Sequence, residues 1–434
     1  MAPSEVGAVR RRRREVVPRG PGPGPGLVLS IDRIRSIGAA WPEGLETAMR
    51  RETTWPRTPA VLDTTLREGE QFPGAHFTPE DRVRLALALD AFGVDELELP
   101  SPAISPLAAA ELGELLRIPL RARAQVHTRC HPADVEAALA AGATGLHLFL
   151  GTSDQALTHS LQTSWEVLAG RIRDAVGDAH RAGAFVRFSA EDAFRTPRSR
   201  LFSAFDVAVE AGAERLGLPD TVGIATPEMV GATVRAIRRR YPGVSLEFHG
   251  HNDTGCAVAN SLAAWMAGAD CLDVTVLGIG ERVGITSLSG LMARLLTLSP
   301  QLTARYRLER LPALDADVAG ILGLPIPFNQ PLTGGHAFTH VAGIHTNAVL
   351  REPGTYEAID PSVVGRTRRL SATSRLAGRH AVAQFAQGVL GRRIDAREAQ
   401  LAATAIKSAA TRGALADAEA AAVVRAALAG CGEE

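Results

Sequence analysis

Cysteine is scarce in this chain, and the few cysteines are scattered. The four among 434 residues form no Cys-x-x-Cys pair, so we expect neither a disulfide framework nor a zinc-ribbon site. Such a chain suits a reducing compartment, and we expect a cytoplasmic protein. Long apolar runs are also missing, since no stretch approaches the roughly 20 residues that a membrane helix requires.

An excess of charge of one sign is absent too. The 47 basic and 47 acidic side chains give a formal net charge of zero, so no overall field would recruit nucleic acid or an anionic membrane. The local exception is the arginine run from Arg10 to Arg14, which leads into Pro-Gly repeats. Because a signal peptide needs an apolar stretch after its charges, residues 1–26 are predicted to form a disordered basic arm.

Short β-prone runs alternate with longer Ala/Leu-rich helical patterns between residues 58 and 310. The eight strand candidates are 60–63, 96–99, 122–127, 145–150, 185–189, 215–218, 245–249 and 271–276. This rhythm predicts an α/β fold, a (β/α)8 TIM barrel that forms the catalytic domain. A doubly wound sheet is the alternative, but the first βα turn lacks a Gly-rich dinucleotide fingerprint.

The rhythm changes after the predicted barrel. Residues 311–335 contain four prolines and several glycines, which favour a linker. A smaller, mainly helical C-terminal domain is predicted over 336–434. Its Ala-rich helices, from about 382 to 429, are typical of packing and oligomerisation elements.

Two histidines lie where the seventh predicted strand would end. His249 and His251 are two residues apart, and the period of a strand places both on the side that faces the barrel axis. Two imidazoles converging there can share one metal ion. A pair of ordinary polar strand residues explains a lone His-x-His about as well.

A second polar cluster, 63–71, follows the first predicted strand. In a closed barrel that strand lies close to the seventh, so Glu68 can supply a carboxylate to the same ion. A site with two histidines and one carboxylate keeps positions open for substrate, as catalysis requires. The alternative is that Arg67 and Glu68 form an ordinary ion pair at the surface with no catalytic role, but this does not account for their position at a strand end.

Other predicted strands also end in polar residues. These would gather at the C-terminal mouth, where barrel enzymes place their active sites. Three of the groups there are basic, namely Arg67, His127 and Arg187. Together they imply an anionic substrate, and more than one carboxylate would suit them.

Two motifs carry a resemblance to a known family. They are Leu66-Arg67-Glu68-Gly69-x-Gln71 and the stretch 246–259, which contains His249-x-His251-Asn252-Asp253. With them, the chain resembles the family of homocitrate synthases and 2-isopropylmalate synthases from about residue 58 to 374. Ile279 stands where the isopropylmalate enzymes usually have Asn. The stretches 186–195, 276–288 and 337–356 are also similar to homocitrate synthases in particular.

The resemblance implies one divalent metal ion, Zn, Mn or Mg, with Glu68, His249 and His251 as its ligands. Arg67 would stabilise the charge that develops on the substrate oxygen. The positions that match residues holding the 2-oxo acid, besides Arg67, are His127, Arg187, Ser189 and Thr221.

Further residues are implied to act in catalysis. Glu191 matches a carboxylate of the catalytic apparatus. His345 and Tyr356, from the second domain, match residues that act in proton transfer and reach into the barrel of the partner subunit. The resemblance therefore implies a domain-swapped homodimer.

The activity that this resemblance implies is an acyl transfer in lysine biosynthesis. Acetyl-CoA would condense with 2-oxoglutarate to give homocitrate and CoA, and thioester hydrolysis would make the step irreversible. Two alternatives stay open. The same chemistry could act on another acceptor, namely 2-oxoisovalerate, oxaloacetate or a phosphonate analogue. An inactive barrel with a binding role is disfavoured, because the five residues of the metal site and the proton transfer are all present.

One position departs from the family pattern. Lysine-pathway homocitrate synthases tend to carry Asp on the fourth strand where this chain has His147, and that Asp helps to bind the ammonium group of inhibitory lysine. We therefore expect weak or absent inhibition by lysine. The loop 151–164 also diverges after Ser153, and that divergence bears on the distal group of the acceptor.

Overall fold

The computed structural model describes residues 56–429, so the predicted basic arm, 1–26, lies outside the described residues. Eight parallel strands pair in sequence order and close into a barrel, since β1 pairs with both β2 and β8. The strands are β1 (Ala60–Asp63), β2 (Glu96–Leu99), β3 (Arg123–Arg129), β4 (Gly145–Gly151), β5 (Phe185–Glu191), β6 (Arg215–Asp220), β7 (Ser245–Gly250) and β8 (Cys271–Val274). The predicted (β/α)8 barrel is confirmed.

Six strands end at positions other than those predicted. β6 runs two residues farther, to Asp220, and β4 and β7 each run one residue farther, to Gly151 and Gly250. β3 and β5 both run two residues farther, to Arg129 and Glu191, because pairing with β4 continues toward the mouth of the barrel. β8 stops at Val274, two residues early. The chain turns there into η4 (Val276–Gly278), where Leu277 has a left-handed φ of 60°.

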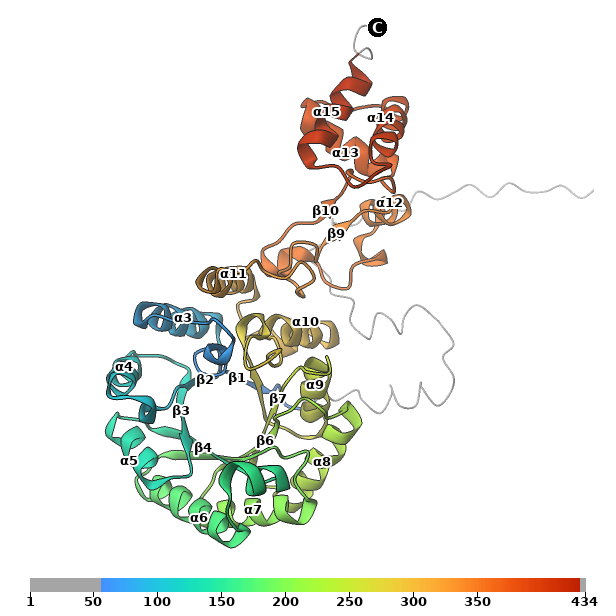
Figure 1. Cartoon of the computed structure of the whole chain (residues 1–434). Coiled ribbons are helices and arrows are strands. Elements are labelled where there is room, and N and C mark those ends of the chain that lie inside the picture. The colour runs from blue at the N-terminus through green and yellow to red at the C-terminus, as the bar shows by residue number, and fades with distance from the viewer. Residues whose placement is uncertain (1–55, 430–434) are drawn as a thin grey trace, which may run out of the picture.

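Helices wrap the barrel on the outside (Figure 1). They are α3 (Pro79–Phe92), α4 (Pro106–Leu116), α5 (Pro132–Ala140), α6 (Trp165–Arg181), α7 (Arg198–Ala211), α8 (Pro227–Arg240), α9 (Ala257–Ala267) and α10 (Leu288–Leu298). The sequence marks several of their starts. Thr78, Ser105 and Thr226 each cap a helix with the side-chain oxygen, and each is followed by a proline at the first helical position, which suits proline's fixed φ and missing N–H.

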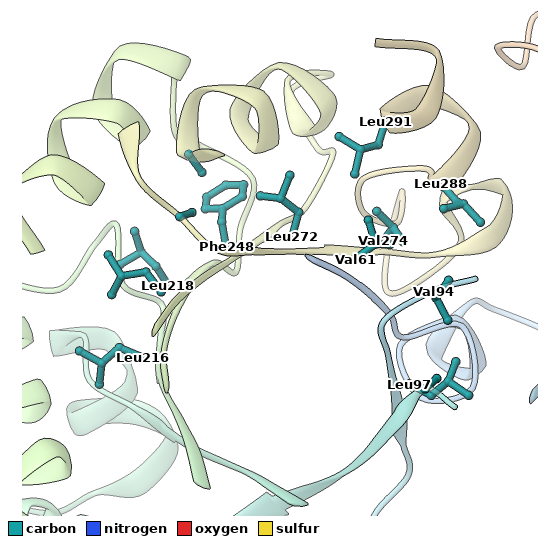
Figure 2. Close-up of a cluster of buried hydrophobic side chains, with 14 of the residues drawn as sticks. Val61, Val94, Leu97, Leu216, Leu218, Phe248, Leu272, Val274, Leu288 and Leu291 are labelled. Atoms are coloured by element: carbon teal, nitrogen blue, oxygen red, sulfur yellow. The ribbon is translucent and has the colours of Figure 1, made fainter. Parts of the chain in front are cut away.

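The outer face of the barrel is apolar. Val61, Leu97, Phe248 and Leu272 are buried completely, and Figure 2 shows such side chains pointing away from the barrel axis toward the helices. Burying a side chain of this size contributes about 1.5–3 kcal/mol. This layer therefore holds the strands and helices together.

The inner face carries ionisable side chains instead. Glu98, Arg187, Glu247 and Asp273 lie at inward positions of their strands, and each is at most 1% exposed. Burying an ion costs several kcal/mol unless it is paired, and a paired buried ion gives little net stability. An interior with these ionisable groups therefore points to a function rather than to stability.

The segment predicted as a linker, 311–335, differs from that prediction in its first half. A helix, α11 (Leu311–Leu322), begins there with Pro312 in its first turn, where proline initiates a helix instead of breaking it. Leu314 and Val318 are buried in the same hydrophobic core as the barrel, and α11 contacts α3. The chain thus stays packed on the barrel to about residue 322.

A second, mainly helical unit follows and extends away from the barrel (Figure 1). It contains β9 (Thr339–His340), α12 (Gly343–Arg351), β10 (Arg369–Leu370), α13 (Arg379–Leu390), α14 (Ala396–Ala409) and α15 (Asp417–Leu428). Its last three helices bury Val382, Ile406 and Val424 in a core of their own. Among residues 56–429, no helix combines the length and the apolar character needed to cross a bilayer.

Candidate active site

Glu68, His249 and His251 meet at the mouth of the barrel. One ligand atom of each lies within 4.8 Å of those of the other two. The Nε2 atoms of the two histidines are 3.4 Å apart, and Nε2 of His251 lies 3.9 Å from Oε1 of Glu68. The sequence predicted this set, and the fold brings its members together.

The charge states of these three groups fit a cation. Burial lowers the pKa of His249 and of His251 to about 4, so both rings are neutral near pH 7 and their nitrogens carry lone pairs. Burial opposes ionisation of Glu68, yet the charge of Arg67 and the backbone N–H of Glu281 hold its pKa below the usual value. Two neutral imidazoles and a carboxylate form a donor set that suits a divalent ion.

Neighbouring groups orient the predicted ligands. Oδ2 of Asp273 lies 3.0 Å from Nδ1 of His249, so Nδ1 donates its proton there and Nε2 is left to bind an ion. The backbone N–H of Glu281 donates to Oε1 of Glu68 at 2.9 Å. Gly280 permits this approach, because a Cβ at that position would lie 2.8 Å from the same oxygen.

Arg67 is held beside the predicted metal ligands. Its Nε donates to Oε2 of Glu98 at 2.7 Å, and its Nη2 lies 2.5 Å from the same oxygen. Its Nη1 donates to Glu68. The hydroxyl of Thr64 also donates to Oε2 of Glu98, at 2.5 Å. Glu98 therefore fixes the guanidinium at the mouth of the barrel.

Arg187 is the second cation of the interior, and it is 1% exposed. Its Nη2 donates to Asp273 at 3.1 Å and contacts Glu247, while Nη1 lies 3.6 Å from Glu98. Arg187 thus links the carboxylate behind Arg67 to the carboxylate behind His249.

The opposite side of the mouth, formed by β3, β4 and β5, is lined by rings and a hydroxyl. His127 stacks on Phe149 with ring centroids 4.1 Å apart, and it meets His147 edge-on at 5.0 Å. Nε2 of His147 lies 2.8 Å from Oγ of Ser189. This wall faces the metal-ligand set across the mouth.

A cavity of about 250 Å³ joins the two sides. Its lining includes nearly all the site residues predicted from the sequence, namely Arg67, Glu68, His127, Arg187, Ser189, Glu191, Thr221, His249 and His251. Burial raises the pKa of Glu191, and the neighbouring Asp192 raises it further. A carboxyl with a raised pKa inside a cavity is suited to proton transfer.

His345 and Tyr356 do not line this cavity. They lie together in the second unit, with ring centroids 4.2 Å apart, and Tyr356 is 45% exposed. Within one chain the structure pairs the two residues with each other and leaves them outside the barrel mouth.

Two residues that organise the site, Glu98 and Asp273, were not predicted from the sequence. A signal for both was available. Each is an acidic residue between apolar neighbours in a short strand, in the runs Glu96–Leu99 and Cys271–Val274. Period-two alternation turns such a residue toward the barrel axis.

Family models match most of the chain. One described as HMGL-like covers residues 58–318, and one described as homocitrate synthase post-HMGL domain-like covers residues 332–414. "Homocitrate synthase, mitochondrial" of Penicillium rubens is 40% identical over 75% of this chain and 69% of its own. "Homocitrate synthase, cytosolic isozyme" of Saccharomyces cerevisiae is 39% identical over 74% and 75%.

A relative named for another product is about as similar. "Probable 2-isopropylmalate synthase" of Methanopyrus kandleri is 41% identical over 74% of this chain and 64% of its own. Among solved structures, the HMG-CoA lyase of Bacillus subtilis covers 63% of this chain and 97% of its own, with a TM-score of 0.57 and 20% identity. At that identity the likeness shows the barrel fold.

Proposed function

Because this chain belongs to the HMGL-like family, we propose that it condenses acetyl-CoA with a 2-oxo acid. The observation that carries the proposal is the convergence of Glu68, His249 and His251 beside Arg67 in one cavity. A 2-oxo acid offers a keto oxygen and an adjacent carboxylate, which together chelate a divalent ion.

The residues around the predicted metal site have two different roles toward the acceptor. A divalent ion held by Glu68, His249 and His251 supplies Lewis acidity to the keto carbonyl and a template for the acceptor. Arg67 then stabilises the negative charge that develops on the former keto oxygen during carbon attack. Its bonds to Glu98 hold the guanidinium in place, so little reorganisation is needed when that charge forms.

The acetyl side of the reaction needs a group that removes a methyl proton. Glu191 lies in the cavity with a raised pKa, which burial causes, and we assign it to the catalytic apparatus. His345 and Tyr356 are proposed to act in proton transfer in the barrel of the partner subunit. Their contact with each other outside the cavity of their own chain supports that assignment.

The acceptor that we propose is 2-oxoglutarate, with homocitrate and CoA as products in cytoplasmic lysine biosynthesis. Three observations support it: the match of the second unit to the homocitrate synthase model, the relatives named homocitrate synthase, and the polar wall at His127 and Ser189. We propose these two residues, with Arg187 and Thr221, as the acceptor-binding set. The alternative, another 2-oxo acid such as 2-oxoisovalerate, has support in the equal similarity to the Methanopyrus relative.

A thiol assay tests the proposal. Release of CoA from acetyl-CoA is measured with 2-oxoglutarate, oxaloacetate, 2-oxoisovalerate and a phosphonate analogue, before and after chelation and after Zn²⁺, Mn²⁺ or Mg²⁺ is restored. We expect the fastest metal-dependent release with 2-oxoglutarate. Preference for another acid would select the alternative acceptor, and no release with any of them would contradict an enzymatic role.

A further inference from the structure

Three side chains, on β2, β4 and β5, form a continuous hydrogen-bonded row at one wall of the cavity. Glu98 on β2 contacts Nδ1 of His147 on β4, and Nε2 of His147 lies 2.8 Å from Oγ of Ser189 on β5. Gly217 on β6 leaves room for this serine, because a Cβ there would lie 1.9 Å from its Oγ. Ser189 and His147 line the cavity, whereas Glu98 lies behind them.

The direction of each proton in this row follows from its first member. Burial opposes ionisation of Glu98, but Arg67 and His147 hold its pKa well below the usual value. An ionised carboxylate only accepts hydrogen bonds, so Nδ1 of His147 must donate to it. Burial, together with the charge of Arg187, lowers the pKa of His147 to about 3, so the ring is neutral and its Nε2 is an acceptor. The hydroxyl of Ser189 therefore donates its proton to His147.

This arrangement fixes what Ser189 offers to a ligand. With its proton committed to His147, the Oγ atom presents only lone pairs to the cavity. A carboxylate also presents only lone pairs, so it cannot accept a hydrogen bond from Ser189 in this state. Protonation of His147 would reverse the hydrogen bond between His147 and Ser189. Nε2 would then donate to Oγ, and the hydroxyl proton of the serine would be free to turn toward the ligand.

We propose that His147 is a specificity-determining positioning residue, and that an acceptor whose second carboxylate binds at Ser189 enters together with one proton that His147 takes up. The inference rests on the proposed function, since it concerns the wall that faces the chelating end of the 2-oxo acid. An acceptor with an apolar side chain needs no such proton. Discrimination between the two classes of acceptor therefore depends on pH.

The charges around His147 make this uptake possible. The titratable and charged groups that face its ring among residues 56–429 are Glu98 on β2, His127 on β3, Arg187 on β5 and Arg67 after β1. The carboxylate favours a charged ring, and the two arginines oppose it. A ligand carboxylate at Ser189 adds a second anion beside the ring and offsets the arginines.

Calorimetry of acceptor binding counts the proton directly. The metal-loaded full chain is titrated without acetyl-CoA, in two buffers of different ionisation enthalpy, with 2-oxoglutarate, oxaloacetate or 2-oxoisovalerate. Chelation contributes equally to all three acids, so their difference isolates the side-chain end. We expect greater proton uptake with the two dicarboxylates than with 2-oxoisovalerate, and a difference that grows as the pH falls. Equal uptake with all three acids would overturn the inference while leaving the proposed function intact.

The variant His147→Asn separates a positioning role from a structural one. Its amide N–H can still donate to Glu98, but it cannot reach Ser189, whose proton is released for a ligand. In the wild type, the ratio of KM for 2-oxoglutarate to KM for 2-oxoisovalerate should rise by up to tenfold for each unit by which the pH is raised. In the variant that dependence should vanish, and KM for 2-oxoglutarate at pH 8.5 should fall.

A matched control is His131→Gln, at an exposed histidine beyond the end of β3. It should leave the pH dependence of KM unchanged for both 2-oxoglutarate and 2-oxoisovalerate. If His147→Asn raised both KM values together and kept the pH dependence, His147 would be merely structural and the inference wrong. Absence of CoA release with every acceptor would contradict the proposed function instead, and the calorimetric proton count would still decide the role of His147.

Discussion

Asp273 illustrates how a single residue behind the site determines what the site can bind. Its carboxylate accepts the proton of Nδ1 of His249 and also holds Nη2 of Arg187. The variant Asp273→Asn keeps the shape and an acceptor oxygen but removes the ionisable carboxyl. We expect about a 10- to 100-fold loss of metal affinity with the fold retained, measured by competition with a chelating indicator.

The control for that measurement is Asp174→Asn, an exposed carboxylate on α6, which should bind metal like the wild type. Equal metal affinity in Asp273→Asn would show that the ring of His249 is oriented by packing alone.

His147 also bears on inhibition by lysine. The Glu98 carboxylate behind the cavity already accepts from Thr64, Arg67 and His147, so an ammonium group would find no free carboxylate there. We therefore expect L-lysine at millimolar concentration to leave CoA release with 2-oxoglutarate unchanged. Tight inhibition competitive with 2-oxoglutarate would contradict this expectation.

At the scale of elements, the loop that follows β8 acts as a brace for Glu68. Gly280 lies against the carboxylate, and a Cβ there would approach Oε1 to 2.8 Å. Gly280→Ala should therefore displace Glu68 and lower kcat/KM by about 100-fold, since displacing a group of the active site by about 1 Å can cost that much in rate. Gly243→Ala, where a Cβ meets nothing within 4 Å, should keep full activity and gives the comparison in the same thiol assay.

Helix α11 supports the same loop through a buried carboxyl. The hydroxyl of Thr333 donates to Asp315, and the backbone N–H of Leu277 also bonds to it. Burial raises the pKa of Asp315 to about 6, so the folded chain holds this proton more tightly than the unfolded chain does. The stabilisation is complete below the unfolded value near 4 and is lost as pH rises through 6.

The variant Asp315→Asn removes this ionisation. Relative to the variant, the wild type should lose roughly 2–3 kcal/mol of unfolding free energy between pH 4 and pH 7. Urea denaturation of both proteins at the two pH values measures the difference. A difference that does not change with pH would show that Asp315 keeps one protonation state in the folded and unfolded chains.

At the scale of the whole molecule, the question is whether the second unit contributes His345 and Tyr356 to the active site of its own chain or to that of the partner subunit. The proposed domain swap predicts complementation between two inactive chains. In a mixed dimer of Glu68→Gln and Tyr356→Phe chains, one site combines an intact barrel with an intact second unit from the other chain. Equal mixing should recover about a quarter of the wild-type activity, because half of the dimers are mixed and one of their two sites is intact.

Each single variant measured alone is the control for that experiment and should stay nearly inactive. No recovery on mixing, with mixed dimers verified by affinity tags, would place His345 and Tyr356 in the barrel of their own chain or outside catalysis altogether.

The sequence by itself determined the barrel and most of its mouth. Alternating strand and helix patterns predicted eight parallel strands, and strand-end motifs predicted Glu68, His249 and His251, because side-chain direction in a strand follows from the position in the sequence. Local signals do not report packing partners. For that reason the first half of the predicted linker was missed as a helix, since proline can begin a helix as well as break one.

Only the tertiary structure decided how the buried charges pair. Glu98 lies 31 residues from Arg67 and 49 from His147 in sequence, and Asp273 lies 24 from His249. Barrel closure alone brings these groups within hydrogen-bonding distance, where burial and neighbouring charges set their protonation. The proton of Ser189, the lone pair of His249 and the fixed position of Arg67 all follow from that closure.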